Sequence, residues 1–142
     1  MATAKIAYAA SANLTVTNLN SLAASSSFLG GWKSAPVDNT TDLYLDYRLA
    51  VKVTAAATNT QAGEIRVYLV GPLDDSNWPD SAGVAIGSEG TGTWTSAEIR
   101  DASARLGAIS NTTATASRVY FLDIPSVAAV FGGNLPKKFA VF

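Results

Sequence analysis

The sequence contains no histidine and no cysteine. Without histidine there is no Ser–His–Asp or Cys–His catalytic system, and without cysteine there is no disulfide scaffold or conventional zinc site. Charged residues make up only 15% of the chain, where about 25% is usual. A net charge of −1 leaves no basic surplus for nucleic acid. We therefore predict a protein that is not an enzyme and does not bind nucleic acid.

Long hydrophobic runs are also missing. No segment reaches the roughly 18–20 apolar residues that a membrane span requires, and residues 1–12 lack the sustained apolar stretch of a signal peptide. We expect no membrane partner. The weakly charged, Ser/Thr-rich surface fits two alternatives: a subunit packed among neighbours in an assembly, or an ordinary secreted or viral β protein.

Alternation of apolar and polar residues predicts β-strands. The clearest pattern covers residues 43–54 and recurs over 64–70, and we expect these two segments to form a long hairpin. Further strands are predicted at residues 13–17, 32–37, 84–86, 105–110, 117–124 and 137–142. The apolar residues of the best strands are expected in the core: Leu45, Leu49, Val51, Ile65, Val67, Leu69 and Phe121.

Helical signals are few and short. Residues 95–98 match a capping box, followed either by one helical turn and the strand 105–110 or by a full helix that ends at Gly107. Residues 126–131 predict a short helix closed by Gly132-Gly133. The predicted fold is all-β: one antiparallel β-sandwich domain over residues 1–142, jelly-roll-like, with one or two short helical turns. The last strand is either short or continues beyond Phe142.

No group of residues points to catalysis or to a bound cofactor. The densest acidic cluster, Asp74, Asp75 and Asp80, suits a turn, a calcium site or, remotely, a glycosidase pair. The cluster lacks EF-hand spacing, and we predict a turn with no tightly bound metal. Gly87, Gly90 and Gly92 lack the strand–helix context of a phosphate-binding loop, so we expect them to form a turned or flexible excursion.

The three tryptophans, Trp32, Trp78 and Trp94, are the candidate contact residues, because each lies in a predicted loop or strand end. Such a ring can anchor a loop to the core, pack against a neighbouring subunit or form a platform for a sugar. We expect Trp78 to be buried against the domain or a neighbour.

Four stretches carry a family resemblance: MATAKIAY (1–8), VDNTTDLYLD (37–46), IRVYLVG (65–71) and PSVAAVFGGNLPKKFAVF (125–142). Together they resemble small virion structural proteins of tailed bacteriophages. The resemblance implies a capsid cement or decoration protein, assembled in the host cytoplasm into the virion. It also implies the major capsid protein as partner, a homo-oligomer with a trimer favoured, and a last strand that continues past Phe142. The alternative is a carbohydrate-binding β-sandwich module of a phage tail or fibre.

Overall fold

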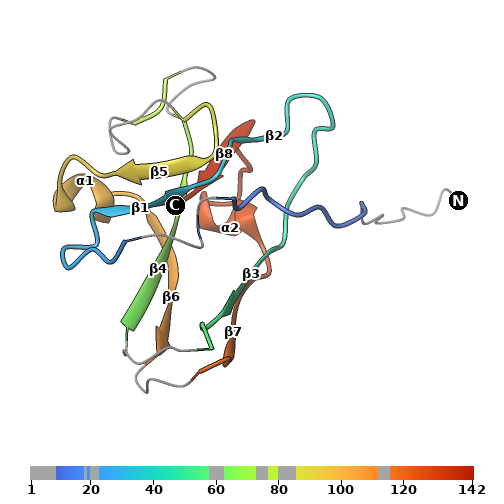
Figure 1. Cartoon of the computed structure of the whole chain (residues 1–142). Helices are drawn as coiled ribbons and strands as arrows, with labels where there is room; N and C mark the ends of the chain where they lie inside the picture. The colour runs from blue at the N-terminus through green and yellow to red at the C-terminus, as the bar shows by residue number, and fades with distance from the viewer. Residues whose placement is uncertain are drawn as a thin grey trace, which may run out of the picture.

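The chain folds into short strands and two brief helices (Figure 1). The computed structural model describes residues 9–17, 19, 23–57, 63–72, 77–79, 86–111 and 116–142. The elements are β1 (Gly30–Lys33), β2 (Val37–Asp38), β3 (Leu49–Thr54), β4 (Gly63–Val70), β5 (Gly90–Thr93), α1 (Ala97–Asp101), β6 (Ala104–Asn111), β7 (Val119–Ile124), α2 (Val127–Val130) and β8 (Lys138–Val141).

The strands form one four-stranded sheet and two ribbons. The sheet has the order β2-β8-β4-β6, and the ribbons pair β1 with β5 and β3 with β7. Every one of these pairings is antiparallel. Figure 1 shows β4 beside β6 in the lower part of the view, with the β3–β7 ribbon to their right. The prediction of an antiparallel all-β fold with short helices is confirmed at this level.

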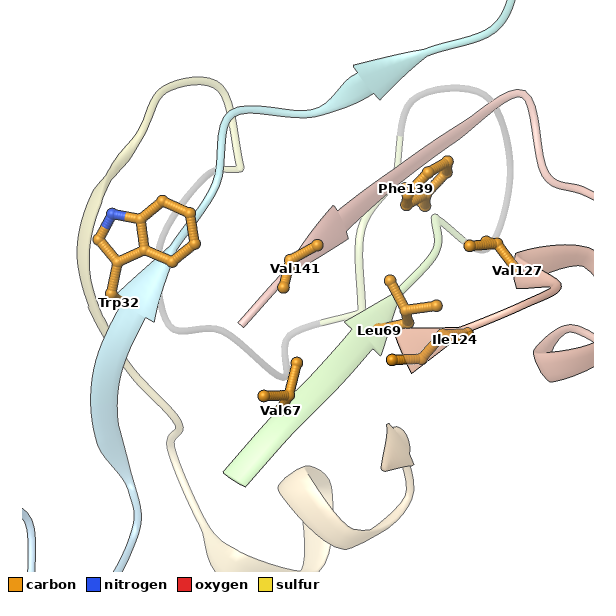
Figure 2. Packing of buried hydrophobic residues seen from close by; sticks show 7 residues of the cluster. All are labelled: Trp32, Val67, Leu69, Ile124, Val127, Phe139 and Val141. Carbon is orange, nitrogen blue, oxygen red and sulfur yellow. The ribbon is translucent and has the colours of Figure 1, made fainter. Parts of the chain in front are cut away.

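The four-stranded sheet is apolar on both faces, because alternate residues of a strand point to opposite sides. On β4, Val67 and Leu69 belong to one buried cluster, whereas Tyr68 and Val70 belong to a second. The members of the first cluster are Trp32, Val67, Leu69, Ile124, Val127, Phe139 and Val141 (Figure 2). The members of the second are Tyr68, Val70, Ile86, Trp94 and Ala140. Both faces of β4 therefore carry core, which explains its continuous burial from Val67 to Val70.

The predicted hairpin of residues 43–54 and 64–70 is wrong. The first strand begins only at Leu49 and pairs with β7, whereas β4 pairs with β6 and β8. The ribbon β3–β7 places Leu49 opposite Ile124 and Val51 opposite Leu122. These facing side chains pack on the first cluster, so β3 contributes to the core through a partner that is distant in sequence.

The predicted core is confirmed for some residues and wrong for others. Val67 and Leu69 are buried, and Leu49 and Val51 pack against the first cluster while partly exposed.

Leu45, Phe121 and Ile65 are the residues for which the core prediction fails. Leu45 is 92% exposed because it precedes β3, and Phe121 is 71% exposed because it lies on the face of β7 opposite to Leu122. Ile65 is also exposed, because burial along β4 increases toward its end and Ile65 lies in its first half.

The helical segment after residue 95 resolves as one short helix followed by a strand. Helix α1 begins at Ala97, and its N-cap is Ser96, whose Oγ accepts a hydrogen bond from the Ile99 N–H. The predicted capping box therefore begins one residue too early. Strand β6 follows and helix α2 forms as expected.

Several other predicted strands differ from the structure. Residues 13–17 are described and are not in a strand, and the predicted strand 32–37 is replaced by β1 and β2 on either side of Ser34. Ile86 is in a turn, and residues 84–85 lie outside the described residues. Strand β5 forms where a glycine-rich excursion was expected.

The glycines of the β1–β5 ribbon allow a close approach of an aromatic ring. Gly31 lies opposite Gly92, and a Cβ at either residue would meet the Phe142 ring at 2.6 and 3.0 Å, respectively. Both glycines are therefore packing residues, and Gly92 does not belong to a flexible loop.

Replacing Gly31 with alanine is expected to lower the free energy of unfolding by about 1–3 kcal/mol, because the added methyl group overpacks the Phe142 ring. Gly30→Ala is the matched control, since its Cβ would come no closer than 3.8 Å to Ser25. Urea unfolding of both variants checks the difference. Equal losses in both would show that the Phe142 contact does not limit Gly31.

Candidate contact surfaces

Titratable residues do not gather into a catalytic or metal-binding group in the described part of the chain. No group of three or more His, Cys, Asp or Glu residues there could hold a metal ion. None of the helices described is long and apolar enough to cross a membrane. The acidic cluster Asp74, Asp75 and Asp80 lies outside the described residues.

Two of the three candidate contact tryptophans, Trp32 and Trp94, are buried in the core. Trp94 is 1% exposed and packs edge-on against Tyr68, with its ring centroid 4.7 Å from that of Phe142. Trp32 is buried in the first cluster, and its Nε1 donates a hydrogen bond of 2.8 Å to Glu89 Oε1. These two rings therefore anchor β1 and β5 to the core and are not available as surface platforms. Of the three roles expected for these rings, their burial supports anchoring to the core.

Trp78 is half-buried and packs against the second cluster. The ring was expected to be buried against the domain or a neighbour, and this contact covers part of it with the domain. Of the three tryptophans, Trp78 is the one that retains partial access to solvent.

Three exposed apolar residues lie together in a turn between β2 and β3. We call residues 42–45 the apolar turn: Asp42, Leu43, Tyr44 and Leu45. Leu43 is 66% exposed and Leu45 92% exposed, and Tyr44 is also exposed. Sequence alternation predicts Leu43 and Leu45 on the core face of a strand, and the structure shows both on the surface.

Asn39 holds the apolar turn in shape. Its buried amide donates from Nδ2 to the Tyr44 carbonyl at 2.9 Å and accepts at Oδ1 from the Tyr44 N–H at 2.8 Å. The Tyr47 hydroxyl donates to the same Oδ1. Leu43 adopts a φ of 52°, a left-handed conformation that costs about 1–2 kcal/mol for a residue other than glycine. The turn is therefore a fixed structure that displays Leu43 and Leu45.

Asp46 fixes the other end of the apolar turn. Its Oδ1 accepts hydrogen bonds from the Ala128 N–H at 2.7 Å, at the start of α2, and from the Tyr47 N–H. Desolvation alone would raise the pKa of Asp46, but hydrogen bonds from Ser126 and from these backbone groups outweigh it and lower the pKa. The turn is thus tied to α2 by an ionised carboxylate.

The substitution Asp46→Asn is expected to reduce the free energy of unfolding by about 0.5–1 kcal/mol at pH 7, because a charged acceptor is replaced by a neutral one. The pKa of Asp46 in the folded state lies below its ordinary value of 3.8, so the ionised carboxylate stabilises the fold at pH values above 3.8. This stabilisation is lost as the pH falls through the folded-state pKa. The difference between variant and wild type should therefore shrink below about pH 4. Urea unfolding at pH 7 and pH 3 measures it; a difference independent of pH would contradict the assigned role.

A second exposed apolar surface lies on the outer side of the β3–β7 ribbon. The residues that point outward, called here the outer ribbon face, are Ala50, Lys52, Thr54, Val119, Phe121 and Asp123. Phe121 lies directly opposite Lys52, and Val119 opposite Thr54. At one end, Arg48 pairs with Asp123 through two hydrogen bonds of 2.9 and 2.7 Å. Hence this face combines exposed apolar side chains with a lysine.

A shallow hollow of about 420 Å³ lies between residues 23–27 and the β1–β5 ribbon. Alanine, serine, glycine and threonine line it, and none of its lining residues titrates. The hollow therefore offers no group for acid–base chemistry or for binding a charged ligand.

No protein-family model, no curated protein and no solved structure matches this chain. What the chain offers for function is the geometry of its own surfaces. Two of these, the apolar turn and the outer ribbon face, expose apolar side chains on supports fixed by hydrogen bonds or by strand pairing. Such surfaces suit binding to another protein.

Proposed function

We propose that the chain is a non-enzymatic structural protein of a virion, a capsid cement or decoration protein that binds the major capsid protein and copies of itself. The observation that carries this proposal is the apolar turn: leucines on a strained turn, held from inside by the buried Asn39. Single exposed apolar residues are common, but a turn built to display them is typical of an interaction site. The resemblance to small phage virion proteins supports the same role.

Binding in many copies suits surfaces of this size. A capsid lattice presents the same contact repeatedly, so modest individual affinities add through multivalency. We propose a homo-oligomer, with a trimer favoured by the three-fold axes of capsids. Assembly would take place in the host cytoplasm, with the protein residing in the virion.

We further infer that the sheets form a jelly-roll-like sandwich. Support comes from β4 and β8, which place apolar residues on both faces of the four-stranded sheet. The ribbons β3–β7 and β1–β5 supply part of the side chains that cover these faces.

Cryo-electron microscopy of particles from the virus that encodes this chain tests the proposed function. We expect density for the chain on the outside of the capsid shell, with contacts both to the shell and to like copies. Density confined to the tail, or a solitary monomer on the shell, would contradict the cement role.

The alternative, a sugar-binding module of a tail or fibre, now has less support. It relied on accessible tryptophans, and Trp32 and Trp94 are buried. A glycan array with the isolated chain distinguishes the two functions. Selective binding of a sugar, abolished by Trp78→Ala, would favour the alternative.

A further inference from the structure

We infer that the apolar turn of one copy docks on the outer ribbon face of a second copy. This inference rests on the proposed self-association and names the two surfaces that meet. Both surfaces expose leucine, tyrosine, phenylalanine or valine side chains to solvent, in the turn at residues 43–45 and on β7 at Phe121 and Val119. Burying them against each other would remove apolar area from water on both copies.

The charges on the two surfaces are complementary. The turn carries Asp42 beside Leu43, and the ribbon carries Lys52 directly across from Phe121. Both charged residues are exposed, and neither has an ion-pair partner among the residues that the structure describes. An acidic, apolar turn therefore matches a ribbon with a lysine beside an exposed phenylalanine, which favours this pairing over turn against turn or ribbon against ribbon.

The turn is also prepared for binding. The Asn39 amide closes it on the Tyr44 backbone, and Asp46 ties its end to α2. A surface that is already ordered loses little conformational entropy on association. The partner surface consists of paired strands and is ordered as well.

The two surfaces belong to different regions of the same copy, as Figure 1 shows: the turn follows β2, and the β3–β7 ribbon lies at the far end of the molecule. Each copy would therefore give its turn to one neighbour and its ribbon to another. Such a heterologous contact closes into a ring, for example a trimer, when the rotation between copies permits.

A charge swap in the full chain tests this contact. Asp42→Lys and Lys52→Asp are each expected to weaken self-association at least about tenfold, because each juxtaposes like charges. The double variant restores the opposite pair and should associate within about threefold of wild type. Sedimentation velocity over a series of concentrations measures the dissociation constants.

A second double variant, Glu98→Lys with Lys52→Asp, has the same net charge as the swap but places the reversal on α1. It should remain as weak as Lys52→Asp alone. Phe121→Ser and Leu45→Ser should also weaken association about tenfold or more. The melting temperature of the monomer, measured at a concentration below the dissociation constant, should remain nearly unchanged because both side chains are exposed.

The results separate this contact from the proposed function. An oligomer that is insensitive to all of these changes, or a swap that restores nothing, would overturn the docking of turn on ribbon and leave self-association by another surface. A chain that stays monomeric at every concentration would also overturn it. Microscopy of the particle tests the cement role independently of either result.

Discussion

Replacing Trp94 with alanine is expected to lower the free energy of unfolding by about 3–5 kcal/mol. The indole is 1% exposed and contacts Tyr68 and Phe142, which come from two different strands or their ends. Truncation leaves a large cavity that these rings cannot fill without moving. Equilibrium unfolding in urea, followed by circular dichroism, measures the loss.

Trp94→Phe is the informative partner of that variant. In the described chain, Trp94 Nε1 is buried without a hydrogen-bond partner, a condition that costs about 1–3 kcal/mol. Phenylalanine keeps much of the ring and removes the unsatisfied N–H, so we expect a net loss below about 1.5 kcal/mol. A loss as large as that of Trp94→Ala would show that the N–H has an acceptor in solution, such as a bound water.

Leu69→Ala is expected to cost about 2–5 kcal/mol, because this side chain is fully buried between β7, β8 and α2 (Figure 2). Leu45→Ala is the matched control: it makes the same chemical change at a residue that is almost fully exposed. At a concentration where the chain is monomeric, we expect a loss below about 0.5 kcal/mol. The same unfolding measurement serves both variants. A larger loss at Leu45 would indicate that the turn packs against the chain, contrary to the structure.

The strands with strong local signals were predictable from the sequence. Residues 64–70 alternate and are followed by Gly71-Pro72, and the observed β4 ends at Val70. The short helix and the strand that follows residue 95 were also anticipated, to within one residue at the N-cap Ser96. Here short-range propensity and tertiary packing agree.

The pairing of strands was not predictable in the same way. Alternation reports which residues share a face but not which strand lies alongside, and the expected neighbour of β3 was replaced by the distant β7. Strand β5 was missed because its glycines suggest a loop, whereas Gly92 is small so that the Phe142 ring can approach.

The apolar turn shows why a surface can be misread from sequence. Leu43 and Leu45 continue the period of Leu49 and Val51, so alternation alone extends the strand through them. The strand is stopped by Asn39, whose side-chain amide forms hydrogen bonds with both the N–H and the carbonyl of Tyr44. The turn-forming residues Asn39 and Asp42 were the available signal, and they would have placed the leucines in a turn.

The tryptophans were assigned to contacts because their segments look like loops, but burial depends on tertiary packing.

The central place of β8 bears on how the protein must be made. Synthesis proceeds from the N-terminus, so β2 and β4 leave the ribosome long before the strand that lies between them. Until β8 arrives, β4 presents an unpaired edge bearing Leu69 and Val70, the kind of edge on which nascent chains can join one another. This sheet can therefore close only after residues 138–141 have left the ribosome. Copies synthesised at the same time must keep these incomplete edges apart until residues 138–141 insert.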